Sequence, residues 1–191
     1  MLTERIALII IVTASGNVFA HASSTTPETR SPAAITVRSA EVSAVVRKNS
    51  CGPVADSVLR VVSIESQYNV GLSVVCRSKV NGKTPPDAVV HESITEVYQI
   101  TEGRGVLVTG GTIESALPLP ADDPDVRRLI GPSSIGRLIL EGTRQDVGPG
   151  DVVVIPPHTP HGFVELKTER IVYTLIRIDP QRLLELKGQP R

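Results

Sequence analysis

Short runs of apolar residues, mostly Val, Ile and Leu, alternate with turn residues along the chain from residue 57 onward. The runs at residues 57–64 and 69–77 are typical, because polar or turn residues bound each of them. Runs of this length that are rich in β-branched residues favour strands. We therefore predict strands at residues 57–64, 69–77, 87–91, 95–101, 104–109, 136–142, 151–155, 162–166 and 170–178.

No helical pattern separates these predicted strands, so the chain does not have the alternation of strands and helices that parallel sheets require. An all-β sandwich or barrel with antiparallel sheets is expected instead. The 15 Gly and 15 Pro supply the turns that such a fold needs. Glu102 and Gly103, between two predicted strands, are expected to form a tight hairpin turn.

Three segments differ from this strand pattern. Residues 37–48 predict a short helix capped by Ser39, although the many valines fit a strand almost as well. Residues 110–131 form a long loop with an acidic centre and several prolines, and loops of that length are often functional, for instance as a lid. Residues 180–187 are expected to form a short helix that packs on the body through its leucines.

The N-terminus predicts export from the cytoplasm. An apolar run at residues 6–13 is far below the ~20 residues that span a bilayer, and Ala20-His21-Ala22 fits a signal-peptidase site. An uncut membrane anchor is the alternative. We thus divide the chain into a signal peptide (1–22), a linker and N-terminal segment (23–50), a barrel (51–180) and a C-terminal helix or tail (181–191), and expect a periplasmic or secreted protein.

Composition narrows the range of partners. Lys+Arg and Asp+Glu are equal at 20 each, which gives no electrostatic reason to bind nucleic acid or an anionic membrane surface. Aromatic residues make up only 3% and Trp is absent, so stacking platforms for single strands are not expected. A chain of 191 residues is long enough for one buried core. After processing, neither nucleic acid nor a membrane is an expected partner.

Two cysteines, Cys51 and Cys76, leave two interpretations open. They could form a disulfide in an oxidising compartment. They could equally be separate thiols, because Cys76 lies in an apolar strand pattern. Their spacing does not suit a zinc site, which uses close pairs of ligands.

The histidines carry the chemical signal. His21 leaves with the signal peptide, whereas His91, His158 and His161 all flank predicted strands. The first cluster is spaced His91-x4-Glu96-x6-Gly103, and the second is spaced Gly150-x5-Pro156-x4-His161.

These two segments resemble the signature motifs of the cupin superfamily, G-x5-H-x-H-x3–4-E-x6-G and G-x5-P-x-G-x2-H-x3-N. The resemblance covers residues 57–179 and implies a double-stranded β-helix, or jelly roll. The runs T-E-V-Y (95–98) and L-V-T-G-G (107–111) are similar to those of single-domain, exported bacterial cupins.

The sequence departs from the motifs at four positions. Lys83 stands where the family has its opening Gly, and Val89 stands where it has its first His. His158 replaces the Gly of the second motif, and Glu165 replaces its closing Asn. The resemblance therefore carries over three metal ligands residue by residue: His91, Glu96 and His161.

Two histidines and one carboxylate can hold one face of a divalent ion, such as Fe, Zn or Mn, and leave positions open for a substrate. If His91 faces the interior of the barrel, so does Val89, because residues two apart in a strand share a face. An interior Glu96 needs a cation beside it to be tolerated. Tyr98 and His158 are the candidates for handling substrate protons. Tyr98 could instead simply pack in the barrel, and His158 could be a fourth ligand or a solvent-exposed loop residue.

We therefore expect a metal-dependent enzyme acting on a small molecule, of the oxygenase, lyase or isomerase type. The alternative is a non-enzymatic cupin that binds a sugar or an organic acid without a metal, with Glu96 paired to an Arg. A homodimer that forms through strands at the barrel edge is a further expectation.

Overall fold

The computed structural model describes residues 33–48, 51–85, 88–137 and 139–188. The predicted signal peptide, residues 1–22, lies outside the described residues. The chain divides into two units, residues 1–34 and 35–191, and the second unit contains all the helices and strands of the described residues. None of the described helices is both long enough and apolar enough to cross a bilayer.

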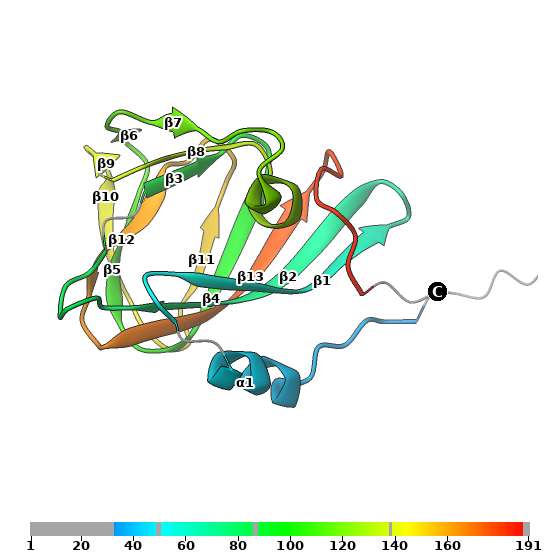
Figure 1. The fold of residues 1–191 in the computed structure, drawn as a ribbon, viewed down its shortest axis with the longest axis horizontal. Helices are drawn as coiled ribbons and strands as arrows, with labels where there is room; N and C mark the ends of the chain where they lie inside the picture. Colours follow the sequence, from blue (N-terminus) through cyan, green and yellow to red (C-terminus); the bar gives the residue numbers. More distant parts are fainter. Residues whose placement is uncertain (1–32, 49–50, 86–87, 138, 189–191) are drawn as a thin grey trace, which may run out of the picture. The chain divides into compact units, whose positions relative to one another are not determined.

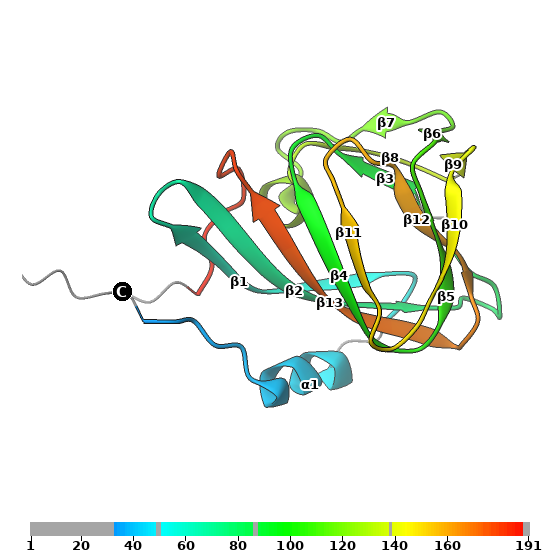
Figure 2. The ribbon, with the colours of Figure 1, turned by 180° about the vertical axis from the view of Figure 1, so that it is seen from behind.

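Two antiparallel sheets face each other and form most of the structure (Figures 1 and 2). The longest predicted strands are present in the structure, so the prediction of an all-β jelly roll is confirmed. In the order of their pairing, the first sheet contains β1 (Ala55–Ile64), β2 (Tyr68–Ser78), β13 (Arg170–Asp179), β4 (Thr95–Glu102) and β11 (Val152–Ile155), and the second contains β10 (Thr143–Val147), β5 (Gly105–Thr109), β12 (His161–Leu166), β3 (Ala88–His91), β8 (Ser133–Gly136) and β7 (Leu117–Pro118).

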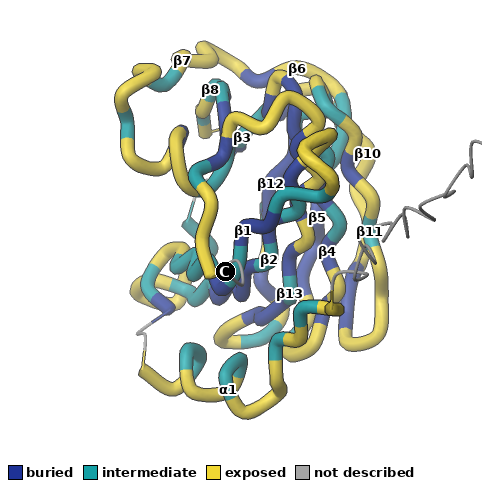
Figure 3. Tube along the Cα trace, turned by 90° about the vertical axis from the view of Figure 1, so that its right-hand side faces the viewer, coloured by how far each residue is buried: buried dark blue, intermediate teal, exposed yellow. Residues whose placement is uncertain are grey.

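Alternation of side chains along each strand places the core between the two sheets. In β4, Glu96, Tyr98 and Ile100 are buried, whereas the residues between them are partly or fully exposed. Figure 3 shows the buried residues concentrated along the strands, while most connecting loops are exposed. The main apolar cluster draws on both sheets: Val75, Tyr98, Ile100, Leu107, Val147, Ile155, Phe163, Leu166, Ile171, Tyr173 and Leu175.

The predicted hairpin at Glu102 and Gly103 is wrong. β4 pairs with β13 and β11, whereas β5 pairs with β10 and β12, so the turn carries the chain from one sheet to the other. Gly103 has a φ of +79°, and a Cβ added there would lie 2.1 Å from the carbonyl oxygen of Arg170. Only glycine fits at this corner, because the backbone of Arg170 lies too close for a side chain. A hairpin turn also favours glycine, so the sequence alone does not distinguish the two structures.

The remaining segments agree with the predictions only in part. Helix α1 (Ser39–Lys48) confirms the helical interpretation. The long loop contains two short strands, β6 (Thr112–Ile113) and β7, and a π-helix, η1 (Val126–Ile130). The predicted strand at 136–142 is split between β8 and β9 (Ile139–Leu140), and β9 pairs with β6.

The predicted C-terminal helix is also wrong: the described residues 180–188 form turns and a single bridge. Lys187 exchanges both backbone hydrogen bonds with Val61, which draws the segment along β1 in an extended form. Asp179 Oδ2 accepts the backbone N–H of Leu184 at 2.9 Å. Leu184 is buried, so one of the predicted leucines does pack on the body.

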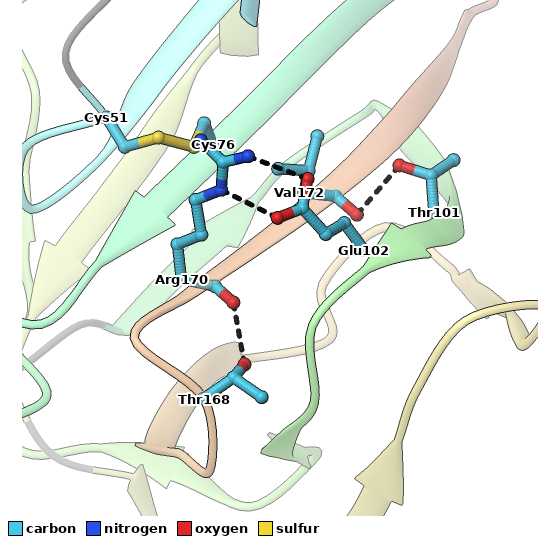
Figure 4. The surroundings of a disulfide bond; sticks show 7 residues. All are labelled: Cys51, Cys76, Thr101, Glu102, Thr168, Arg170 and Val172. Atoms are coloured by element: carbon cyan, nitrogen blue, oxygen red, sulfur yellow. Dashed lines mark hydrogen bonds and ion pairs between the residues drawn. A yellow bond between two sulfur atoms is a disulfide. The ribbon is translucent and has the colours of Figure 1, made fainter.

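Cys51 and Cys76 form a disulfide, with their Cα atoms 5.0 Å apart (Figure 4). The bond ties the residues before β1 to β2. Partly buried valines of α1 pack against this bond and against Val74 and Val172, on the outer side of the first sheet. Disulfides persist in oxidising compartments, so the bond indicates an extracytoplasmic location.

The disulfide makes a prediction about stability. Replacing both Cys51 and Cys76 by Ala should lower the free energy of unfolding by about 3 kcal/mol, because the bond closes a loop in the unfolded chain. Urea unfolding of the variant and of the wild type, with and without reductant, measures the difference. Equal unfolding midpoints for the oxidised and reduced wild type would contradict the prediction.

Candidate metal centre

His91, Glu96 and His161 meet between the two sheets. Glu96 comes from β4 in the first sheet, whereas His91 ends β3 and His161 begins β12 in the second. Their potential ligand atoms all lie within 4.8 Å of one another. The residues are 3%, 1% and 2% exposed, so the cluster is removed from bulk water. The three ligand positions carried over from the motifs are therefore brought together.

The Glu96 carboxylate lies between the two imidazole rings. His91 Nε2 is 3.4 Å from Glu96 Oε1, and His161 Nε2 is 3.2 Å from Glu96 Oε2. The ring centroids of the two histidines are 5.2 Å apart. The same nitrogen of each ring thus faces the carboxylate.

An outer hydrogen bond sets the tautomer of His91. Its Nδ1 lies 2.8 Å from Ser133 Oγ, and that hydroxyl in turn lies 2.8 Å from the carbonyl oxygen of Gly131. The carbonyl can only accept, so the hydroxyl proton goes to it and the hydroxyl oxygen accepts from Nδ1–H of His91. In the neutral ring, Nε2 then has a lone pair directed toward Glu96.

His161 is held in the same way. Its Nδ1 lies 2.9 Å from the carbonyl oxygen of Thr159, which can only accept, so Nδ1 bears the proton. Nε2 is buried and has no hydrogen-bond partner. Nε2 of both rings therefore faces one carboxylate, and a cation among the three atoms would be bound by all of them. This donor set fits a divalent metal ion.

A buried arginine, Arg177, also contacts Glu96. It lies opposite Glu96 in the pairing of β13 with β4, and its Nε donates to Glu96 Oε1 at 2.8 Å. Its other nitrogens donate to Ser73 Oγ at 3.1 Å and to Asp56 Oδ2 at 2.5 Å. The other Glu96 oxygen accepts the Tyr98 hydroxyl at 2.9 Å. Both carboxylate oxygens are thus held by donors.

These contacts decide the charges in the site. Burial alone would raise the pKa of Glu96, but the Arg177 guanidinium, with help from His91, holds it well below its usual range. Burial lowers the pKa of His91 despite the nearby Glu96 carboxylate. Burial, followed by the Glu96 charge, raises the pKa of Tyr98 well above its usual value. Near neutral pH the site therefore holds a carboxylate, a neutral His91 and a neutral phenol.

A cavity of about 170 Å³ opens beside the cluster and is lined by His91, Glu96, Tyr98 and His161. Val89, at the position where the family motif has its first His, also lines it, as expected from the shared strand face. The cavity would bring a small molecule next to an ion held by these three side chains. Leu129 and Ile130 close part of the wall, so the long loop contributes to the site, as its length suggested.

A larger groove of about 640 Å³ lies next to the cavity and shares Asp56, Asp125 and Leu129 with it. The C-terminal segment and α1 contribute its other sides, through residues such as Leu186 and Val45. The inner cavity and the outer groove therefore adjoin at these three residues.

The two residues expected to handle protons lie in different surroundings. Tyr98 is 3% exposed, lines the cavity and stacks on Tyr173 with ring centroids 4.5 Å apart. His158 is exposed and does not appear among the residues that line the cavity. Its backbone N–H donates to the carbonyl oxygen of His91 at 2.8 Å, with a φ of +61°. Its proton-handling role stays a prediction.

Sequence reasoning missed Ser133, Arg177 and Asp56. One signal was present for Arg177, because it occupies an inward position of β13 between the inward residues Leu175 and Asp179. A charged residue on the buried face of a strand requires a partner. Ser133 and Asp56 have ordinary sequence surroundings, and only the fold brings them to the site.

Comparisons with known proteins bear on the fold. Residues 136–190 match the family model described as AraC-like ligand binding domain. No curated protein sequence matches the chain significantly.

Solved structures with a similar arrangement include oxalate oxidase in complex with the substrate analogue glycolate, which is 17% identical over 69% of this chain and 53% of that chain, with a TM-score of 0.39. KdgF from Halomonas sp. is 17% identical over 68% of this chain and 82% of that chain, with a TM-score of 0.39. BH2720 from Bacillus halodurans is 10% identical over 82% and 92%, with a TM-score of 0.40.

The chain spans about half the length of the oxalate oxidase, and identities this low say nothing about activity or ligand. The fold is assigned from three features of the chain itself. It has two facing antiparallel sheets, the two motif segments at residues 91–103 and 150–161, and a match of residues 136–190 to a ligand-binding family. This protein has a cupin-type fold, with the buried cluster of His91, Glu96 and His161 between its sheets.

Proposed function

We propose that the protein is an exported cupin that binds one divalent metal ion through His91, Glu96 and His161 and uses it as an enzyme on a small molecule. One observation carries the proposal: separate outer hydrogen bonds orient both imidazoles so that their Nε2 lone pairs face the same buried carboxylate. In metal sites the second ring nitrogen commonly has such a partner.

Iron, zinc and manganese all suit this donor set. A bound ion would supply Lewis acidity or redox chemistry of the kind that oxygenases, lyases and isomerases use. The chain's own contribution is the shape of the site. The cavity of about 170 Å³ admits a small organic ligand and is walled on one side by apolar residues such as Val89 and Leu175.

We assign proton handling to Tyr98. It lines the cavity, and its raised pKa keeps the hydroxyl protonated, so it can donate to a ligand in place of Glu96. His158 was the second residue expected to handle protons. Its exposed position adds no support for that role.

Export is part of the proposal. Cleavage of a signal peptide after residue 22 would deliver the chain to the periplasm or the medium, and the disulfide supports such a compartment. A homodimer stays a prediction.

A metal-free binding protein is the second candidate, and Arg177 favours it. The guanidinium of Arg177 donates to Glu96 Oε1 at 2.8 Å and so already places a positive charge beside the carboxylate. The metal-free alternative predicted such a pair between Glu96 and an Arg. The matching family is described by ligand binding. This candidate predicts that a ligand raises the unfolding temperature in the presence of a chelator.

Metal analysis separates the two candidates. Protein purified from its native compartment should carry about one metal ion per chain. The variants His91→Ala and Glu96→Gln should lose the metal because each removes a ligand. His158→Ala is the matched control and should retain it, since His158 is exposed. Unchanged metal content in the first two variants, or none in the wild type, would refute the metal site.

The outer hydrogen bond to His91 makes a finer prediction. Ser133→Ala should weaken Zn²⁺ binding by about tenfold, because Nδ1–H loses its acceptor and the ring its orientation. Ser134→Ala, one residue along β8, is the control and should bind as the wild type does. Competition with a chromophoric chelator gives both affinities. Equal affinities for the two variants would show that Ser133 does not orient His91.

A further inference from the structure

Asp56 lies outside the three-residue cluster, yet it belongs to the same buried network of charges. Its Oδ2 accepts from Arg177 at 2.5 Å, and Arg177 bonds in turn to Glu96. The side chain of Asp56 is 14% exposed, and that of Arg177 is 4% exposed. Asp56 also lines both the inner cavity and the outer groove.

The charges in this network do not balance. Two carboxylates, those of Asp56 and Glu96, share the single guanidinium of Arg177. The buried network therefore carries one excess negative charge. Buried charge without a counter-charge is costly, so the network favours an additional cation.

The hydrogen bonds point to the same deficit. Asp56 Oδ1 and His161 Nε2 are two of the four buried side-chain atoms that lack a hydrogen-bond partner among the described residues. Both are acceptors here, since a carboxylate oxygen has no proton and Nε2 bears a lone pair. A network that leaves two acceptors unmet has too few donors or cations.

The other arginine that lines the cavity, Arg77, is engaged with aromatic side chains: its Nε donates to the Tyr173 hydroxyl at 3.0 Å, and its guanidinium lies 5.7 Å from the centre of the Phe163 ring. Asp125 adds negative charge, but it is exposed and screened by water.

We infer that Asp56 is a positioning residue that sets metal affinity through Arg177, although it is not itself a ligand. Arg177 fixes the Glu96 carboxylate but also repels an incoming cation. Asp56 offsets that repulsion, so that a divalent ion leaves the buried network with one net positive charge rather than two. This inference rests on the proposed metal site.

The first test is the isosteric variant Asp56→Asn, with Co²⁺ as the probe. The amide oxygen of Asn can still accept from Arg177, but the negative charge is gone. Co²⁺ binding should weaken by about tenfold or more, because a full charge near the ion is lost in a medium of low effective dielectric. The Co²⁺ absorption bands should keep their positions, since the ligand set is unchanged. Without metal, the variant should unfold at no lower urea concentration than the wild type.

Matched controls separate charge from simple disruption of the network. Ser73→Ala removes one hydrogen bond to Arg177 without altering charge and should bind Co²⁺ within about threefold of the wild type. Arg170→Met removes the other arginine of β13, which is exposed and paired with Glu102, and should change nothing. The double variant Asp56→Asn/Arg177→Met restores the original net charge and should recover much of the lost affinity, a coupling that a double-mutant cycle measures.

Each outcome decides one point. Co²⁺ binding by Asp56→Asn within twofold of the wild type, shifted absorption bands, or an equal loss in Ser73→Ala would overturn the inference and leave the metal site standing. Absence of Co²⁺ binding by the wild type would overturn the proposed function as well. If the double variant does not fold, the comparison of Asp56→Asn with Ser73→Ala still decides.

Discussion

The burial of the Glu96 carboxylate between two sheets is the interaction on which the rest of this structure depends. A carboxylate that is 1% exposed is costly unless its charge and both oxygens are satisfied. Arg177, on the neighbouring strand of the same sheet, supplies the charge, and Tyr98 supplies a hydroxyl. The two histidines approach from the opposite sheet, so the carboxylate also fixes how the sheets meet at this point.

The two histidines show that the backbone prepares the site as much as the side chains do. Thr159 contributes only its carbonyl to His161, and Gly131 contributes its carbonyl to the serine that orients His91. Both carbonyls belong to segments next to strands of the second sheet, where the backbone is fixed by pairing. Val89 fits this arrangement, because a small apolar residue beside His161 leaves space in the cavity where a third imidazole would stand.

The sequence predicted most of the fold because runs of apolar residues mark the long strands of both sheets. It missed β10, whose residues Thr143–Val147 are exposed except for the last, since an edge strand shows little alternation. It took the corner at Gly103 for a hairpin because glycine serves both geometries. The three candidate ligands were predicted from motif spacing, whereas Ser133 and Asp56 could not be, because their contacts with the cluster join distant strands. Those contacts are set by pairing partners, and nothing local in the sequence encodes them.

The disulfide has a consequence that reaches the site. Cys51 lies just before β1, the edge strand that carries Asp56, and the bond holds it to β2, where Ala55 pairs with Cys76 and Asp56 with Val75. The first residues of this edge strand pair on one side only, with β2, so they are easily released. The disulfide thus anchors the end of β1 that carries Asp56, and it links a covalent bond on the outer side of the sheet, through Asp56 and Arg177, to the charges in the barrel interior.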